Sequence, residues 1–349
     1  MEIGRLTYRF WCSVFCSFFA IAAFAQEVQF AQFYNDPFQL NPALAGASKY
    51  NRAGVHARDQ WPGIKKNYKT YAGFIDHKLS KINSGIALYA LQDVAGDGAL
   101  TYTNIALSYG YGVRLNYRQM LRFGARTAFA NRSIDFNKLV FADQLLRETT
   151  GASVEGFNNN SVSYLDFAFG IEWKHDKYNL RVGAAADHLN QANQSFTATQ
   201  YNLPMRYSGY VLYDHMIKGD YRAKTPVYVS YTALYKAQLN WDQLDIGAIY
   251  HYGALELGLM YRGIPGLKAY QPGYANNEAI IIYAGFQWLN MHMGYNYDVS
   301  LSKLSQSQSH GAHEITLVFA YDSSSKKKKP RSIPCSDIVG TSMVKKIRF

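Results

Sequence analysis

Large apolar residues alternate with small or polar ones over many short stretches of this chain. In one stretch the large residues are Ile105, Leu107, Tyr109, Tyr111, Val113 and Leu115, and the residues between them are Ala106, Ser108, Gly110, Gly112 and Arg114. A repeat of two residues is typical of β-strands. Large apolar side chains on one face and small or polar ones on the other favour a membrane barrel, with lipid outside and a polar lumen inside. A soluble β-sandwich also alternates and stays an alternative.

About 14 such stretches follow one another, so the sequence predicts an all-β, transmembrane antiparallel β-barrel, similar to barrels of the fatty-acid-channel type. The predicted strands are 52–58, 69–79, 83–93, 99–115, 117–131, 161–175, 178–189, 207–218, 225–237, 242–251, 254–262, 278–288, 291–300 and 311–321. An even number of strands places both ends of the barrel in the periplasm. Most of the links expected at the periplasmic side are short, and most of those expected outside are long.

Two of the predicted outer loops, 132–160 and 263–277, are rich in aromatic residues and asparagine. Loops held by a rigid scaffold often contain the residues that bind partners. For 132–160, a solvated loop without a binding role is an equally good interpretation. The segment 26–51 precedes the first strand and contains turn signals around Pro37 and Pro42. We expect it either to fill the lumen as a plug or to lie at the periplasmic rim.

The first 25 residues resemble a secretory signal peptide. Arg5 and Arg9 precede an apolar run over 10–23, and small residues at positions 23 and 25 fit a cleavage site before Gln26. A transmembrane anchor is the alternative, although the run is short for a hydrocarbon core of ~30 Å. The predicted organisation is therefore a signal peptide at 1–25, a periplasmic or plug segment at 26–51, the barrel at 52–322 and a basic tail at 323–349.

Composition supports β structure in a membrane. The chain has 29 Tyr and 20 Phe, and aromatic residues favour strands. Its mean hydropathy of −0.23 excludes a helical membrane protein. Cleavage would leave Cys335 as the one cysteine, which cannot form an internal disulfide.

The net charge of +11 is concentrated partly in the tail, where eight basic residues follow Tyr321. Basic runs can bind nucleic acid or anionic lipid. A secreted chain argues against nucleic acid, so we expect a solvated periplasmic tail or a docking segment for a periplasmic partner.

The sequence offers little enzyme chemistry. The pairs Asp76–His77, Asp187–His188 and Asp214–His215 are adjacent, and adjacent side chains of a strand face opposite sides of the sheet. His310 and His313 form only a weak metal signal, and common hydrolase and nucleotide-binding motifs are absent from the sequence. We therefore expect no catalytic, cofactor or metal site. An outer-membrane enzyme is kept as an alternative function.

Six motifs in order carry a family resemblance: QFYN at 32–35, NPALAG at 41–46, RDQW at 58–61, DVAG at 93–96, YDVSLSKL at 297–304 and GAHEI at 311–315. Together they resemble the PorP/SprF family, outer-membrane proteins of the type IX secretion and gliding systems of Bacteroidota. The resemblance extends over residues 29–321. The basic tail departs from the family pattern.

The motif residues also have direct physical interpretations, each as a structural or a partner-contact residue. Asn41, Pro42 and Gly46 can set a turn before the first strand. Arg58 can reach into the lumen or pair with a carboxylate. The remaining candidates are Trp61 in the aromatic girdle, Asp93 capping a turn that Gly96 permits, and His313 and Glu314 at the start of the last strand.

The resemblance implies a non-enzymatic secretion accessory that supports export or surface anchoring of particular adhesin-type cargo, with outer-membrane lipid around it. Its implied partners are the type IX translocon and machinery and the C-terminal domain of a secreted adhesin. A competing interpretation is an outer-membrane channel for a hydrophobic or small solute.

Overall fold

The structure is a computed structural model that describes residues 27–65, 67–96, 100–141, 144–145, 160–196, 200–219, 225–264, 276–301 and 306–321. The predicted signal peptide, the basic tail with Cys335, and most of the two predicted recognition loops lie outside these residues.

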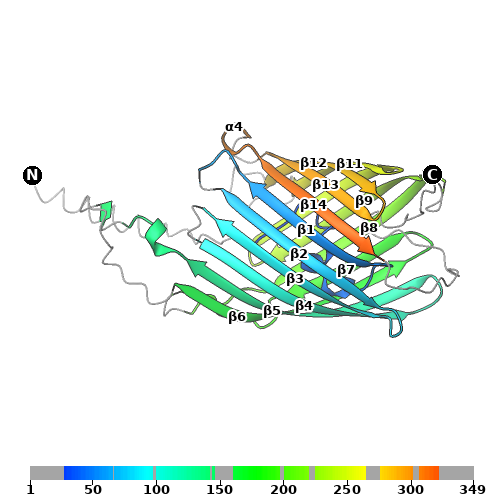
Figure 1. Cartoon of the computed structure of the whole chain (residues 1–349), viewed down its shortest axis with the longest axis horizontal. Coiled ribbons are helices and arrows are strands. Elements are labelled where there is room, and N and C mark those ends of the chain that lie inside the picture. The colour runs from blue at the N-terminus through cyan, green and yellow to red at the C-terminus, as the bar shows by residue number, and fades with distance from the viewer. Residues whose placement is uncertain are drawn as a thin grey trace, which may run out of the picture.

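Fourteen antiparallel strands form one closed barrel, with β1 paired to β14 (Figure 1). The strands are β1 (Asn51–Gln60), β2 (Tyr68–Leu79), β3 (Ser84–Ala95), β4 (Leu100–Arg114), β5 (Gln119–Ile134), β6 (Ser161–His175), β7 (Leu180–Asp187), β8 (Arg206–Lys218), β9 (Val227–Gln238), β10 (Trp241–Tyr252), β11 (Leu255–Gly263), β12 (Asn277–Trp288), β13 (Met291–Ser300) and β14 (Ala312–Tyr321). The predicted barrel and its strand number are confirmed, and the predicted strand ends differ from these by at most three residues.

The two faces of the wall follow the alternation in the sequence. On β4, Leu107 and Tyr109 are about half exposed, whereas Ala106 and Ser108 are fully buried. The exposed face carries the large apolar residues, as a lipid-facing surface requires. The buried face carries the small and charged residues and therefore lines the lumen.

The links divide into two sets, which define the ends of the barrel. At what we call the short-turn end, the links include the two-residue turns 253–254 and 289–290. At the long-loop end they include 135–160 and 188–205. Asn51 pairs with Tyr321, so the first and last strands begin and finish at the short-turn end. Barrels of the outer membrane place short turns in the periplasm and long loops outside.

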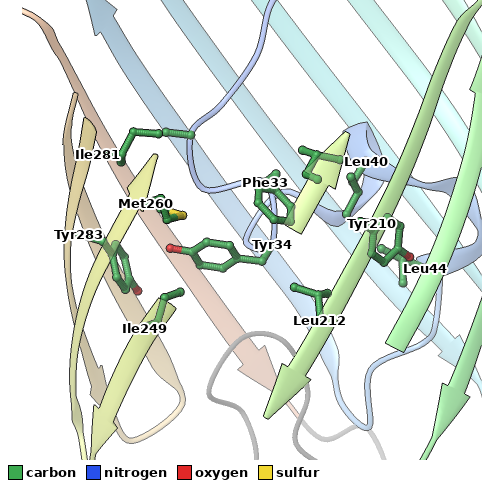
Figure 2. Packing of buried hydrophobic residues seen from close by; sticks show 12 residues of the cluster. Phe33, Tyr34, Leu40, Leu44, Tyr210, Leu212, Ile249, Met260, Ile281 and Tyr283 are labelled. Atoms are coloured by element: carbon green, nitrogen blue, oxygen red, sulfur yellow. The ribbon is translucent and has the colours of Figure 1, made fainter. Parts of the chain in front are cut away.

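Residues 27–50, which we call the lumen segment, lie inside the barrel. The segment contains the short helix α2 (Pro37–Leu40) and the 3₁₀ turn η1 (Pro42–Leu44), each with proline in its first turn, where a missing N–H costs nothing. Figure 2 shows four of its side chains packed against inward side chains of the strands; they are Phe33, Tyr34, Leu40 and Leu44. The sequence was compatible with two positions for this segment, in the lumen or at the periplasmic rim. In the structure, residues 27–50 lie in the lumen.

In the described parts of the long-loop links, η2 covers Phe136–Lys138 and α4 covers Gln306–Ser309. Among the described residues, no helix has the length and apolar character needed to cross a membrane.

Replacing Leu107 by arginine tests the assignment of the outer face. Leu107 lies near the middle of β4 on the exposed face, and a cation at mid-membrane on that face costs about 2–4 kcal/mol. We expect Leu107→Arg to lower the free energy of unfolding in lipid vesicles by about that amount. Tyr117→Arg, in the exposed link 115–118, is the control and should change it by less than ~1 kcal/mol. Equal losses in both variants would contradict the assignment.

Candidate functional site

The lumen segment is bound to the wall first at the seam between β1 and β14. The Glu314 carboxylate accepts hydrogen bonds from the backbone N–H groups of Ala31 (2.7 Å) and Gln32 (2.9 Å). Arg58, on the neighbouring strand, pairs with Glu314 (3.1 Å) and with Asp298 (2.7 Å). All three charged side chains are almost fully buried. Two predicted site residues, Arg58 and Glu314, therefore meet in one buried cluster that holds the segment.

This seam cluster extends along the wall through Arg262. Its guanidinium lies 3.6 Å from Asp298 and pairs with Asp245 on β10 at 3.0 Å. A buried guanidinium needs carboxylate partners to offset its loss of water. Because Arg262 and Arg58 share Asp298, the cluster joins β1, β10, β11, β13 and β14 on their inner faces.

Farther along the segment, the chain approaches the wall so closely that glycine is required. A Cβ on Gly124 would collide with the backbone of Pro42 and Ala43, and one on Gly85 would collide with the backbone of Gly46. Gly46 itself has φ +65°, which L side chains rarely adopt. The predicted turn at Asn41–Gly46 is therefore a turn inside the lumen, fitted against glycines of β3 and β5.

Asn41 fixes this turn through both ends of its amide. Its Oδ1 accepts a hydrogen bond from Ala43 N (2.8 Å) and so caps η1. Its Nδ2 donates to the backbone oxygens of Ile171 (3.0 Å) and Ala184 (3.2 Å) on the wall. One side chain thus sets the local turn and its place on β6 and β7.

Two charged side chains of the wall, Arg122 and Asp76, secure the end of the segment near the short-turn end. Arg122 donates to the carbonyl oxygens of Ala43 (2.9 Å) and Ala45 (2.6 Å). Asp76 accepts from Gly46 N (2.7 Å) and pairs with Arg52 (2.9 Å).

The start of the segment is held at the long-loop end by a second set of charges, which we call the mouth cluster: Glu27, Arg126, Asp166, Asp187, His188 and Arg206. Glu27 pairs with Arg206 and lies 2.6 Å from His188 Nε2. His188 Nδ1 lies 2.9 Å from Asp166. Asp187 joins Arg126 (2.7 Å) to Arg206 (2.8 Å). The cluster therefore ties the lumen segment to β5, β6, β7 and β8.

Two groups of the mouth cluster, His188 and Glu27, lie outside the strands, and the neighbouring charges shift the pKa of each. Burial alone would lower the pKa of His188, but the carboxylates of Glu27 and Asp166 raise it to about 9. Burial would raise the pKa of Glu27, but Arg206 and His188 hold it well below its usual value. Both groups are consequently charged at neutral pH.

The position of His188 corrects a sequence expectation. Adjacent residues on a strand face opposite sides, so Asp187 and His188 were expected to point apart. His188 directly follows the last residue of β7 and has φ +60°, which turns its side chain back into the lumen beside Asp187.

A cavity of about 550 Å³, which we call the mouth cavity, opens beside the mouth cluster. Its walls include the aromatic side chains of Trp61, Tyr68, Tyr89, Tyr102 and Tyr164. They lie on several strands and on the link after β1, so the cavity faces the long-loop end. This volume is typical of sites for small ligands.

Four predicted site residues lie apart from the clusters. Trp61 directly follows β1, with its ring edge-to-face with Tyr68, and lines the mouth cavity. Asp93 was expected to cap a turn, but it lies within β3 and accepts a hydrogen bond from Thr70 Oγ1 on β2 (2.6 Å). Gly96 occupies the turn after β3 with φ +67°. His313 points outward, opposite to Glu314, and contacts Tyr295 Oη (2.8 Å).

One arrangement in the lumen has the order of a catalytic triad. His251 lies 3.0 Å from Ser230 Oγ through Nε2 and 3.4 Å from Glu256 through Nδ1. The Ser230 hydroxyl is engaged by Asp214 (2.6 Å), and the adjacent cavity has only about 20 Å³. A space of that size holds about one water molecule and no substrate. Within the described part of the chain, no three His, Cys, Asp or Glu residues have metal-binding geometry.

One comparison with known proteins finds a protein family that matches most of the chain. The sequence profile of the family described as type IX secretion system membrane protein PorP/SprF matches residues 22–319. No curated protein matches the chain.

Solved outer-membrane structures are similar at low identity. The CymD monoaromatic hydrocarbon channel has 10% identity and a TM-score of 0.47, with 82% of this chain and 93% of that chain covered. Omp33 of Acinetobacter baumannii has 9% identity and a TM-score of 0.42, with 78% and 99% covered. A Pseudomonas aeruginosa FadL homologue has 10% identity and a TM-score of 0.40, with 81% and 92% covered.

Adding a methyl group to Gly124 tests whether the lumen segment is seated on the wall. The new Cβ would strike the backbone of Pro42 and Ala43, and overpacking of this kind costs about 1–3 kcal/mol. We expect Gly124→Ala to lower the free energy of unfolding by that amount and to expose the segment to protease. Gly209→Ala is the control, because nothing lies within 4 Å of its Cβ position. Equal stability of the two variants would refute the close packing.

The mouth cluster predicts a loss of stability at alkaline pH. The pKa of His188 is raised in the folded protein to about 9. Its contribution is complete below the unfolded pKa of ~6.5 and is lost as the pH rises through about 9. We expect the melting temperature to fall between pH 7 and pH 10. His188→Gln should be less stable at pH 7 and should show a smaller fall; a fall of the same size in this variant would rule out His188 as its source.

Proposed function

The chain belongs to the PorP/SprF family of type IX secretion system membrane proteins, and we propose that it supports export or surface anchoring of specific adhesin-type cargo. Family membership associates it with the type IX secretion machinery in the outer membrane. The proposal adds two partners, the translocon and the C-terminal domain of a secreted adhesin, and links the protein to gliding motility. It also includes export with a cleaved signal peptide at 1–25.

The observation that carries this proposal is the filled lumen. Residues 27–50 occupy the barrel interior and are attached to the wall at the seam cluster, the glycine-lined turn and the mouth cluster. A folded cargo domain has no room to pass through such a barrel. The long-loop end therefore offers the surface on which cargo would be held.

A non-enzymatic role is part of the proposal. The charged groups of the seam cluster and the mouth cluster are paired with each other or bound to the lumen segment, and the triad-like set around His251 adjoins a space too small for a substrate. Buried charges with such partners are as expected for a structure that keeps a segment in place. The nine motif residues act in this proposal as structural or partner-contact residues.

The competing function is a channel for a hydrophobic or small solute, and the mouth cavity is the observation that favours it. The lumen segment opposes this function, because a solute would have to displace side chains packed in two hydrophobic clusters.

Deletion of the gene tests the proposed function. We expect one or a few adhesins to disappear from the cell surface while general secretion continues, as measured by surface biotinylation and mass spectrometry. Replacing link 135–160 with a short Gly-Ser linker should have the same effect, because long outer loops are the surface offered to external partners.

The matched control replaces link 219–226 at the short-turn end, which should leave surface adhesins in place. Heat-modifiable migration on a gel verifies that each variant still forms a barrel. Unchanged surface adhesins in both the deletion strain and the loop variant, together with a loss of solute uptake, would establish the channel function instead.

A further inference from the structure

The mouth cavity has a layered wall on its β2–β5 side. Thr70, Asp93, Tyr102 and Arg132 occupy one row across four consecutive strands, in register. The neighbouring row, which lies two residues farther from the long-loop end, includes Leu91, Asn104 and Tyr164. The outer row is therefore polar and charged, while the row beneath it adds apolar and aromatic surface.

Arg132 and Asp93 are the two charged side chains of the outer row, and neither has an ion pair among the described residues. The Arg132 guanidinium lies over the ring of Tyr102, 5.3 Å from the centroid, and its buried Nε has no hydrogen-bond partner. Asp93 lies two strands away, about 10 Å along the sheet, and is hydrogen-bonded to Thr70. A guanidinium presents its donors in a planar fork that matches a carboxylate.

The other cations around the cavity are already neutralised. Arg126, His188 and Arg206 each pair with carboxylates of the mouth cluster. An anion entering the cavity would therefore be drawn to Arg132. Tyr164 is hydrogen-bonded to Arg132 through its hydroxyl group, and the rings of Tyr102 and Tyr164 provide apolar surface beside the charge.

The floor of the cavity is closed by the lumen segment. Tyr89 donates from its hydroxyl to Asp36 of the segment (2.8 Å), and Arg126 donates to Phe38 O (3.1 Å). Val28 and Gln29 of the same segment line one side. A ligand that enters from the long-loop end would therefore stop against the lumen segment, which suits the end of a chain rather than its middle.

We propose that the mouth cavity binds the C-terminal tail of a polypeptide, with its terminal carboxylate on Arg132 and its last side chains among Trp61, Tyr68 and Tyr164. The inference rests on the proposed function and identifies the tail of the cargo as the element that is held. A neutral oligosaccharide would stack on the same rings but would leave Arg132 without an anion.

The test uses the full-length protein in detergent micelles and a positional-scanning library of N-acetylated hexapeptides, made once as free acids and once as amides. We expect members of the free-acid library to bind at least tenfold more tightly than their amides, measured by fluorescence anisotropy. Arg132→Gln should reduce free-acid binding to the amide level, whereas Arg132→Lys should restore part of the difference.

Arg118→Gln is the charge-matched control, since Arg118 lies in the link 115–118 at the short-turn end, and it should bind as the wild type does. Asn104→Trp, which fills the cavity, should abolish binding of both libraries; heat-modifiable migration verifies folding of every variant. Equal binding of acids and amides, wild-type binding by Arg132→Gln, or displacement of every peptide by a neutral hexasaccharide would overturn the inference. None of these results depends on the deletion phenotype, so the inference can fail while the anchoring function stands, and the reverse.

Discussion

Fourteen strands enclose a lumen wider than their own inward side chains can fill, and the way this space is closed determines the rest of the structure. The wall contributes small residues and charges on its inner face, and the preceding 24 residues contribute the apolar volume. Neither part is a complete core alone. The barrel therefore needs residues 27–50 as its interior, in the way that a soluble domain needs its central side chains.

Buried charge adds specificity to this packing. Glu314 binds two backbone N–H groups of the lumen segment and also Arg58. Removing the Glu314 carboxylate would therefore leave hydrogen-bond donors from two parts of the chain without their acceptor. Breaking a buried pair by deleting one partner costs about 3–5 kcal/mol, because the other charge stays buried without compensation. The same groups are weak evidence of high stability, since an apolar replacement of the whole set can be as stable. Their clearest effect is to fix one position for the segment, which apolar contacts alone leave adjustable.

The strands could be predicted from the sequence because each one alternates large apolar residues, which face lipid, with small or polar residues, which face the lumen. The attachment of the lumen segment could not, since Ala31 and Glu314 are 283 residues apart and no local pattern links them. His188 was misplaced because a single left-handed residue after β7 reverses the alternation rule. Asp93 was assigned to a turn because β3 continues to Ala95, two residues beyond its predicted end. The family motifs marked Arg58 and Glu314 correctly as notable residues, but their contact with each other and with Asp298 required the closed barrel.

The direction of the lumen segment affects where on the barrel a partner can bind. Glu27 lies at the long-loop end beside Arg206, and Asn51 begins β1 at the short-turn end, so the segment extends through the whole interior. Opening a pore would require the loss of contacts at both ends and of the turn seated on Gly85 and Gly124 between them. Contact with a partner at the mouth requires none of these losses, because the mouth cavity lies above the segment and not within it. The lower energetic cost therefore favours recognition at the long-loop end over passage through the barrel.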